Sequence, residues 1–527
     1  MSGKYLVSVD LGTTGTKAVV FDLKGVQVGS ANLNSPTYFP RPGRVEQVAE
    51  EVIENLYAST RLAVERSAVD PKDILGISFT HMCTTFVPVD KDGKFLSRII
   101  LWNDTRGGEM FDDVREIWRS HGITEQQDYE YTGYPLGPLA TLPKVMWIKK
   151  NLPEVYAKTY KFVGMQALMI SAFSDAEEYL DDKPGVIYTK LANLETFELD
   201  AERAKWYDID LGKYPRRIAP AVKVGAVTPE AALKTGLLPG TPVYAGAGDQ
   251  RCAAVGAGVA KDGMLSAILG TAGVVHAYSS KPIRHPQGKI SIMGHAGTGN
   301  WQVEGSSSSG ASSFRWIRDT IGQLESSTST LMKRDVYDVM SEIAAQSPAG
   351  SRGVVYGPWL AGADCPRFDV DARATFAGLS FSHTKSDMFR AVMEGAAYEM
   401  KAMIEVAEEA LGGEVSTVRV VGGAAASELW TQIQADIYDK TVETITSSEA
   451  TALAAAMFVA IGSGVYKDVH EAIENMVQVK QVFYPNQENV KRYQELYEIY
   501  TLLYTALAKD VFPRIKTYQD TYVTELS

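Results

Sequence analysis

The chain has 527 residues, of which 45% are hydrophobic and 22% charged. This length allows two or more packed cores, because single domains usually stop growing at about 250 to 300 residues. The 52 basic and 64 acidic residues give a formal net charge of −12, which offers no general attraction to a nucleic acid or an anionic membrane. The composition excludes a disordered or fibrous protein. It predicts small-molecule partners, with no nucleic-acid or membrane partner.

The cysteines and the N-terminal residues indicate in which cellular compartment the protein is expected. Three cysteines lie far apart in the sequence and form no CxxC or Cys/His pattern, so neither a disulfide framework nor a zinc site is predicted. Charged residues interrupt the N-terminus before an apolar leader can build up. The longest uncharged stretches, residues 263–280 and 450–466, fall short of the about 20 residues that a membrane-spanning helix needs. We therefore expect a cytoplasmic protein.

The first part of the chain shows strand and turn signals. Residues 5–22 contain two apolar runs around a Gly/Thr turn, which predicts a buried hairpin, and a third extended run follows the turn at residues 24–25. Residues 47–66 have helical periodicity. Residues 74–89 have β-branched residues around a polar centre. Strands followed by helices indicate an α/β domain, and polar residues at strand ends indicate a site.

One weak internal repeat relates the two halves of the chain. Residues 9–15 read Val-Asp-Leu-Gly-Thr-Thr-Gly and residues 267–273 read Ala-Ile-Leu-Gly-Thr-Ala-Gly. We therefore expect each half to begin its core in the same way, with a boundary near residues 259–263 that separates an N-terminal domain (1–259) from a C-terminal domain (260–527). The later elements are predicted as helices over residues 386–411, 431–438 and 488–511 and as a strand over residues 418–421.

The Gly-Thr turns carry the first chemical signal, because such a turn presents several backbone N–H groups and hydroxyls to a polyphosphate. In the first copy, Asp10 ends a buried strand and suits Mg²⁺ binding through water, and Lys17 suits a phosphate oxygen. The alternative is a Gly-rich hairpin with a capping Asp. The second copy favours the phosphate interpretation, because two facing turns can hold one phosphate chain from both sides.

Two other segments suit phosphoryl transfer. Asp249 closes an apolar run and opens an Ala/Gly-rich helix, where its carboxylate can accept the proton of an attacking hydroxyl; the alternative is an N-capping Asp. Gly422 and Gly423 follow a strand and leave room for an adenine or ribose, or else they serve helix packing. No Walker A, GxGxxG, HRD/DFG or HExxH sequence occurs, which disfavours P-loop kinases, protein kinases, Rossmann dehydrogenases and zincins.

Five segments, in this order, resemble motifs of the FGGY carbohydrate kinase family, and the resemblance covers nearly the whole chain. They are the first phosphate motif (residues 10–17), the sugar-side segment Trp-Asn-Asp-Thr-Arg (102–106), the catalytic Asp segment (248–250), the second phosphate motif (269–271) and the adenosine motif (422–427). The resemblance implies an α/β fold of two RNase H-like lobes, of the actin, hexokinase and heat-shock ATPase type, around a central cleft. It implies closure on sugar and MgATP, which would exclude water.

The resemblance also implies a role for each matching residue. Asp249 is expected to be the catalytic base and Asp10 the Mg²⁺ ligand. The expected ATP ligands are Gly12, Thr13, Thr14, Lys17, Gly270, Thr271, Gly422, Gly423 and Ser427. The expected substrate ligands are His81, Met82, Trp102, Asn103, Asp104 and Gln250. The alternatives are an ordinary core aromatic for Trp102 and a satisfied buried histidine for His81. A homodimer is the assembly that the resemblance favours.

The substrate class stays open between several acceptors. Glycerol kinases of the family carry Arg-Glu where this chain has Met82-Cys83, which disfavours glycerol. Trp102 to Asp104 and Met82 are similar to xylulokinases, but those enzymes usually have Gln-Met-His-Gly and an Asn after the catalytic Asp, where this chain has His81-Met-Cys-Thr and Gln250. The leading hypothesis is an ATP-dependent kinase of a small ketose such as xylulose, or of a polyol. The alternatives are ribulose, erythritol or another polyol as acceptor, and a non-catalytic ATP-switching scaffold.

Overall fold

The structure, a computed structural model, describes residues 3–523, and the chain forms two compact units. The first unit comprises the chain up to Ala260 with Ser279–Gln302 and Glu449–Gln478, and the second comprises Lys261–Tyr278, Val303–Ser448 and the chain from Val479 onward. The sequence predicts two contiguous domains, 1–259 and 260–527, whereas these units interleave along the chain. One reason is α15 (Ala450–Gly462), an apolar helix that is buried in a core of the first unit.

The main sheet of the first unit begins with the predicted hairpin. β1 (Tyr5–Leu11) pairs antiparallel with β2 (Gly15–Asp22) and parallel with β5 (Ile74–His81). The strand order is β11-β12-β5-β1-β2-β3, and β13 also pairs with β5. The remaining strands are β3 (Gln27–Asn34), β11 (Lys223–Ala226), β12 (Pro242–Tyr244) and β13 (Ala247–Gly248).

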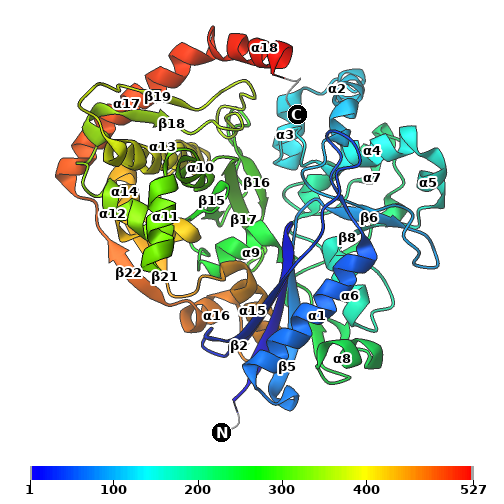
Figure 1. The fold of residues 1–527 in the computed structure, drawn as a ribbon. Helices are drawn as coiled ribbons and strands as arrows, with labels where there is room; N and C mark the ends of the chain where they lie inside the picture. The colour runs from blue at the N-terminus through cyan, green and yellow to red at the C-terminus, as the bar shows by residue number, and fades with distance from the viewer. Residues whose placement is uncertain (1–2, 524–527) are drawn as a thin grey trace. The chain divides into compact units, whose positions relative to one another are not determined.

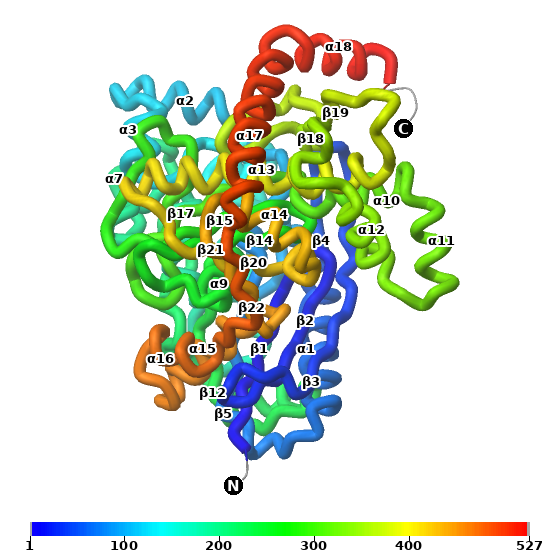
Figure 2. The backbone as a smooth tube through the Cα atoms, turned by 90° about the vertical axis from the view of Figure 1, so that its left-hand side faces the viewer, coloured from blue at the N-terminus to red at the C-terminus, as the bar shows by residue number. Residues whose placement is uncertain are grey.

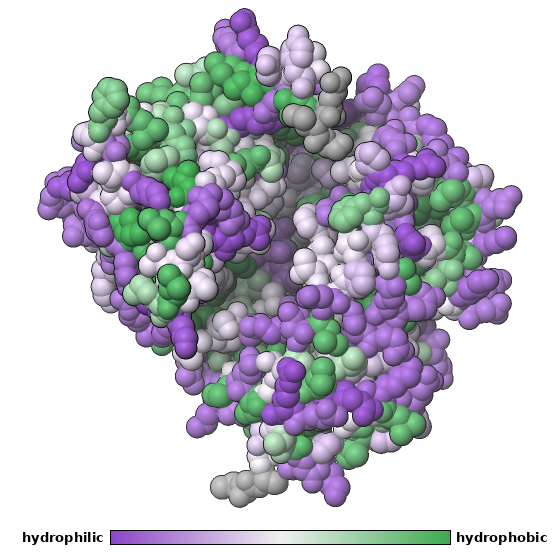
Figure 3. Space-filling model, viewed as in Figure 1, coloured by the Kyte–Doolittle hydropathy of each residue, from purple (hydrophilic) through white to green (hydrophobic). Residues whose placement is uncertain are grey.

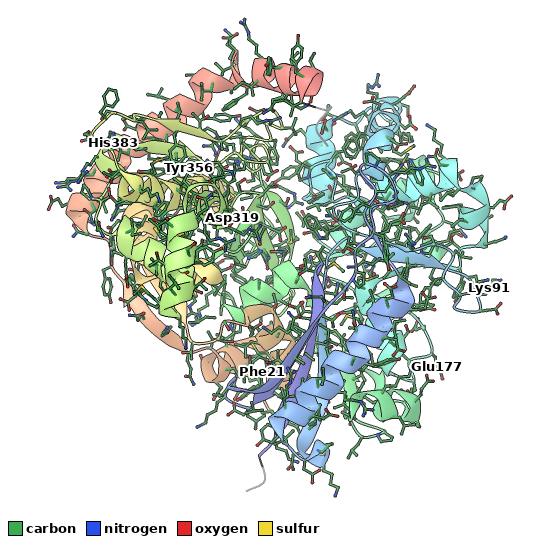
Figure 4. The ribbon with its side chains drawn as sticks, viewed as in Figure 1. Phe21, Lys91, Glu177, Asp319, Tyr356 and His383 are labelled. Atoms are coloured by element: carbon green, nitrogen blue, oxygen red, sulfur yellow. The ribbon has the colours of Figure 1, made fainter. Side chains whose placement is uncertain are left out.

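Helices cover both faces of this sheet (Figure 1). α1 (Ala49–Ser67) packs against β2 and β3, and α15 packs against β1 and β5. Alternate residues of a strand point to opposite faces: Val7 shares a core with α1, while Leu6 shares one with α15. Phe21, labelled in Figure 4, belongs to the α15 core. Burial on both faces explains why β1 and β2 are so apolar.

The rest of the first unit is built around a smaller sheet with the strand order β4-β7-β6-β8, and β9 pairs with β10. α2 (Phe111–Ser120), α4 (Thr141–Asn151) and α7 (Ala201–Trp206) contribute to a hydrophobic core that contains Trp118. The strands are β4 (Glu46–Gln47), β6 (Phe86–Val89), β7 (Ile99–Ile100), β8 (Lys161–Gly164), β9 (Leu180–Asp182) and β10 (Arg216–Ile218). The other helices of this unit are α3 (Glu125–Thr132), α5 (Pro153–Lys158), α6 (Met165–Phe173), α8 (Pro229–Thr235), α9 (Asp249–Gly256) and α16 (Val469–Met476).

The second unit repeats the hairpin arrangement. β14 (Met264–Leu269) pairs antiparallel with β15 (Gly273–Ser279) and parallel with β20 (Thr417–Val421). The sheet has the order β16-β17-β15-β14-β20-β21-β22, with β16 formed by Ser291–Gly294. Figure 2 shows α17 as the long red helix that leads to α18. The other strands are β17 (Trp301–Ser307), β18 (Val355–Gly357), β19 (Thr375–Ala377), β21 (Thr441–Ile445) and β22 (Val479–Phe483). The helices are α10 (Ser312–Ile321), α11 (Gln323–Met332), α12 (Val336–Ala344), α13 (Lys385–Leu411), α14 (Glu428–Tyr438), α17 (Gln487–Ala508) and α18 (Phe512–Tyr522).

The predicted elements agree with the structure apart from their ends. The hairpin, the helix after it and the strand before Gly422 are all confirmed. α14 begins at Glu428, three residues before the predicted start at 431, because Ser427 caps it through its hydroxyl. α17 ends at Ala508, before the predicted end at 511.

The surface is mixed in character. On the face seen in Figure 3, hydrophilic and hydrophobic residues lie side by side and no continuous hydrophobic band crosses the view. Within residues 3–523 no helix is both long and apolar enough to cross a membrane.

Candidate functional site

Three neighbouring strands of the first unit end at one edge of its main sheet and place the candidate catalytic residues there. The parallel register aligns Asp10 with Thr80 and Leu11 with His81, and it aligns Gly248 with His81 as well. The ends of β1, β5 and β13 therefore carry Asp10, His81 and the start of α9 at the same level. Ligands of parallel α/β sheets bind at this carboxyl edge.

The first Gly-Thr turn joins β1 to β2. The Gly12 N–H donates to the Gly15 carbonyl at 3.0 Å, which closes the turn. The Thr14 side chain is exposed, whereas the Thr13 hydroxyl accepts a hydrogen bond from the Trp102 indole N–H at 2.8 Å. The turn therefore connects the predicted phosphate residues to the predicted sugar-side segment.

Asp10 lies among charged and hydroxyl groups. Its Oδ2 accepts a hydrogen bond from Thr451 at 2.9 Å, and Lys17 pairs with Glu449 at 2.5 Å. Burial and then the negative charge of Asp249 raise the pKa of Asp10 to about 7, while the Thr451 hydrogen bond opposes the rise. Lys17 is therefore held by a carboxylate in this conformation, although the sequence predicts a phosphate ligand.

This carboxylate environment fits Mg²⁺. Asp10 and Asp249 are close enough for their charges to interact, and a cation would relieve that repulsion. Among residues 3–523 no cluster of three or more His, Cys, Asp or Glu side chains is arranged to hold a metal ion. This agrees with the habit of Mg²⁺, which usually takes one or two carboxylates and completes its coordination with waters and substrate phosphates.

Asp249 is the first residue of α9, and Gly248 occupies the N-cap position. The capping alternative is therefore wrong for Asp249. Its Oδ1 accepts hydrogen bonds from the Gln250 N–H at 2.8 Å and from the Cys83 thiol at 3.1 Å. Burial raises the pKa of Asp249, and the Cys83 hydrogen bond works in the opposite direction. A carboxylate with a raised pKa at a strand end is well suited to proton transfer.

A small cavity of about 60 Å³ lies beside Cys83. It is lined by a buried ion pair, Arg251 with Asp182, and by a partly buried one, Arg217 with Asp181. Several buried polar atoms of the lining have no hydrogen-bond partner among the described residues; they are His81 Nε2, Thr84 Oγ1, Asp182 Oδ1, Tyr214 OH, Arg217 Nε and Arg251 Nε. Buried polar groups normally find partners, so these atoms indicate a cavity for water or a polar ligand.

His81 and Met82 lie in the wall of this cavity. His81 is only 4% exposed; its Nδ1 lies 3.2 Å from the Met82 carbonyl oxygen, but its Nε2 has no hydrogen-bond partner among the described residues. Protein groups in this part of the chain therefore satisfy only one nitrogen of the buried histidine. Within the same described residues, the Oε1 atom of Gln250 is likewise buried without a partner.

The residues of the sugar-side segment (102–106) differ in their exposure to solvent. Trp102 is 38% exposed, so it is not an ordinary core aromatic, and the buried Oδ1 of Asn103 has no partner among the described residues. Asp104 is fully buried, and its carboxylate accepts hydrogen bonds from Arg106 and from the Val45 N–H. Although burial favours the neutral acid, these hydrogen bonds hold the pKa of Asp104 below its usual value.

The prediction of Asp104 as a substrate ligand therefore needs correction. Both of its oxygens are occupied by protein donors, with Arg106 at 2.7 Å on each. Its structural role is to fix the loop that presents Trp102 and Asn103. The sequence motif showed that the acid belongs to this segment but not the direction in which its side chain points.

The second Gly-Thr turn opens onto a larger pocket of about 570 Å³ in the second unit, within the range of small-molecule and cofactor sites. The pocket brings together four predicted nucleotide residues, Gly270, Thr271, Gly423 and Ser427. It is also lined by residues that the sequence analysis missed, because α10 and α12 carry no glycine motif; they are Phe314, Arg315, Asp335, Tyr337, Asp338 and Ser341.

Backbone geometry explains two residues at this pocket. Gly422 has φ = 94°, and a Cβ there would lie 2.9 Å from the Leu269 carbonyl oxygen, so only glycine fits without strain. Ser427 caps α14 by accepting a hydrogen bond from the Trp430 N–H at 3.3 Å. The glycine therefore lets the end of β20 lie close to Leu269, where the second Gly-Thr turn begins.

Comparison with known proteins agrees with this fold. The solved structure of a xylulose kinase from Lactobacillus acidophilus matches with a TM-score of 0.85 at 24% identity, over 96% of this chain and 99% of that one. The architecture is thus the two-domain α/β fold of sugar kinases, of the actin and hexokinase type.

The sequence comparisons define the family. The N-terminal domain of the FGGY family of carbohydrate kinases matches residues 5–256, and the C-terminal domain of that family matches residues 265–463. The chain belongs to the FGGY family of carbohydrate kinases and is therefore a phosphotransferase; ATP is the phosphate donor of this family.

Two relatives show the range of acceptors in the family. A xylulose kinase of Bacillus subtilis (strain 168) is 30% identical over 525 residues, which cover 98% of this chain and 99% of that protein. A gluconokinase of the same strain is 28% identical over 520 residues, which cover 99% of each chain. Family membership thus establishes a carbohydrate kinase without specifying whether the acceptor is neutral or acidic.

Proposed function

We propose that this kinase transfers the γ-phosphoryl group of ATP to a hydroxyl of a small uncharged ketose, such as xylulose, or of a polyol, and that Asp249 is the general base. The observation that carries the proposal is the shared sheet edge in the first unit. There β1 presents Asp10, β5 presents His81, and the residue after β13 is Asp249.

The role of Asp249 follows from its environment. Burial disfavours the charged form of the carboxylate and raises its pKa, which strengthens it as a proton acceptor when the acceptor hydroxyl attacks phosphorus. Phosphoryl transfer asks little covalent chemistry of the protein, so one base, correct positioning and charge neutralisation suffice.

The nucleotide and the metal ion have matching residues in each unit. The pocket of about 570 Å³ offers Gly270, Thr271, Gly423 and Ser427 to ATP, with Gly422 as the close-approach residue. Asp10 would hold Mg²⁺ together with phosphate oxygens. The ion would supply charge neutralisation on the phosphates.

The charge balance of the small cavity favours a neutral acceptor. Each guanidinium in its lining is already paired with a carboxylate, Arg251 with Asp182 and Arg217 with Asp181. An aldonate such as gluconate would bring a further negative charge with no unpaired cation to receive it, which is unfavourable in a buried site. The unpartnered His81, Thr84 and Tyr214 atoms offer hydrogen bonds that neutral hydroxyls can take.

Other uncharged acceptors fit the same argument. D-ribulose, erythritol and further polyols present only hydroxyl and carbonyl groups, so the acceptor panel must include them. A non-catalytic ATP-switching scaffold has no support now that the chain is placed in a kinase family.

The test is an ADP-release assay with MgATP against D-xylulose, L-xylulose, D-ribulose, erythritol, glycerol and gluconate, with the wild type and Asp249→Asn. We expect turnover on a neutral acceptor and a loss of about 10²-fold or more in kcat for Asp249→Asn, the range of general-base catalysis. ATP affinity should stay close to that of the wild type.

A matched control is Asp92→Asn, which makes the same change at an exposed turn of the first unit and should leave turnover intact. Full activity of Asp249→Asn would remove Asp249 as the base. Strong turnover of gluconate alone would overturn the neutral-acceptor proposal while leaving the kinase assignment in place.

A further inference from the structure

The two oxygens of the Asp249 carboxylate have different surroundings. Oδ1 accepts hydrogen bonds from the Gln250 N–H at 2.8 Å and from the Cys83 Sγ at 3.1 Å. Among the described residues no hydrogen bond reaches Oδ2. Because the protein donors hold the carboxylate through Oδ1, the lone pairs of Oδ2 remain available to accept the proton of a hydroxyl group.

The backbone N–H of Gln250 cannot fix this arrangement by itself. It is a single contact from the residue next to Asp249, and because the Cβ–Cγ torsion has a broad energy minimum, one hydrogen bond holds the plane of the carboxylate only loosely. A second donor from a different strand end supplies the missing restraint. That donor is Cys83, two residues beyond the end of β5, which is 166 positions away from Asp249 in sequence.

The surroundings of Cys83 hold its sulfur in place. Gly248 has no side chain, and a Cβ at that position would collide with the Cys83 sulfur and with the guanidinium of Arg251. Arg251 is itself anchored by its buried ion pair with Asp182. On the other side, the Thr85 hydroxyl donates to the Cys83 carbonyl at 3.2 Å. The thiol is therefore confined between a glycine, a fixed cation and the Asp249 carboxylate.

We propose that Cys83 is a positioning residue for the phosphoryl transfer: its thiol donates to Oδ1 of Asp249 and thereby directs Oδ2 toward the acceptor hydroxyl. This inference rests on the proposed role of Asp249. A thiol is a weak donor. It can therefore orient the carboxylate and lower its basicity less than a stronger donor would. Cys83 does not itself exchange a proton with the acceptor.

The first experiment compares Cys83→Ala and Cys83→Ser with the wild type on the best neutral acceptor. Alanine removes the donor, and we expect kcat to fall about tenfold, which corresponds to about 1.4 kcal/mol of barrier. The KM for the acceptor should change less than about threefold, because the effect acts on the alignment of the base. Serine restores a donor at the same position, so Cys83→Ser should recover most of the lost kcat.

This combination separates positioning from a purely structural role. A side chain that only filled space would be replaced equally well, or equally badly, by alanine and serine, and its loss would lower the melting temperature together with kcat. Equal kcat values for the two variants, or a wild-type kcat for Cys83→Ala, would overturn the proposal.

A second measurement uses the folded wild-type enzyme, so that it stays decisive even if Cys83→Ala does not fold. Methyl methanethiosulfonate forms a mixed disulfide with a thiol and releases methanesulfinate, which removes the S–H donor. The other two cysteines, Cys252 and Cys365, are buried at 0% and 4% exposure, whereas Cys83 is partly exposed. We expect inactivation that dithiothreitol reverses, and no effect of the reagent on Cys83→Ser. Modification of Cys83 without loss of kcat would overturn the proposal.

The Asp249→Asn variant keeps the two proposals distinguishable. If Asp249→Asn is inactive and Cys83→Ala is fully active, only the positioning role fails. If Asp249→Asn is itself fully active, the base assignment fails and takes the positioning role with it.

Discussion

The two Gly-Thr turns both join antiparallel strands, but the side chains of the two hairpins differ in chemistry. In the first, Asp10 pairs across the hairpin with Lys17, and Glu449 and Thr451 add charge and a hydroxyl. In the second, the residue that corresponds to Asp10 in the repeat is Ile268, and residues 264–279 contain no Asp, Glu, Lys or Arg. The same strand-turn-strand element thus carries different side chains in the two units.

The residues that surround the two turns also differ. The first turn is tied to Trp102 and lies on the sheet edge that carries Asp249. The second opens onto a roomy pocket whose lining combines glycines, aromatic rings and capping side chains. Under the proposed function, the first hairpin would serve metal and acceptor chemistry, whereas the second would serve nucleotide binding.

The largest effect is expected from Asp10→Asn, which removes the charge that distinguishes the first hairpin. We expect kcat to fall by about 10²-fold or more, because the amide cannot hold Mg²⁺ as a carboxylate does and charge neutralisation contributes several kcal/mol. Binding of ATP measured without Mg²⁺ should change little. The matched change in the second hairpin, Ile268→Val, should leave kcat intact, and an Asp10→Asn enzyme with wild-type kcat would contradict the division of tasks.

A medium effect is expected from Gly422→Ala, which presses a methyl group against the Leu269 carbonyl at the end of β14, just before the turn of the second hairpin. The positive φ and the close contact should lower the free energy of unfolding by about 1–3 kcal/mol and weaken ATP binding. The control is Gly423→Ala, because a Cβ there meets no atom within 4 Å. Chemical denaturation of both variants checks the difference, and equal stabilities would show that the close approach is not needed.

The smallest effect is expected from Ser427→Ala, which tests whether this residue binds nucleotide or only caps α14. Loss of the cap should lower the free energy of unfolding by about 1 kcal/mol. Thr228→Ala removes an equivalent cap from α8 in the first unit and should cost about the same. If Ser427 also binds nucleotide, only Ser427→Ala should raise the KM for ATP. Unchanged KM values in both variants would show that Ser427 only caps α14.

Much of the fold could be predicted from local patterns. The hairpin 5–22 and its copy at 264–279 were readable because apolar runs around a Gly-Thr turn have few other solutions. The five motifs in order were enough to identify the family, since each glycine or acid sits where a strand ends. These signals lie in short sequence segments, so they can be interpreted without knowledge of any tertiary contact.

The direction of side chains in loops could not be predicted. Asp104 was expected to face the substrate, yet the structure turns it toward Arg106 and the Val45 N–H. The pairing of Val45 with Asp104 joins positions that are 59 residues apart, and no local pattern encodes it. The pocket residues of α10 and α12 were missed because these helices carry no glycine motif.

The sequence by itself determined the α/β class, the family and the positions of Asp10, Asp249 and the glycines, because strand ends and turns have recognisable patterns in short sequence segments. Only the tertiary structure decided which donors meet each carboxylate. Thr451 reaches Asp10 across 441 positions and Cys83 reaches Asp249 across 166. Such contacts depend on how separate elements pack, and the packing is a property of the whole unit rather than of any segment in it.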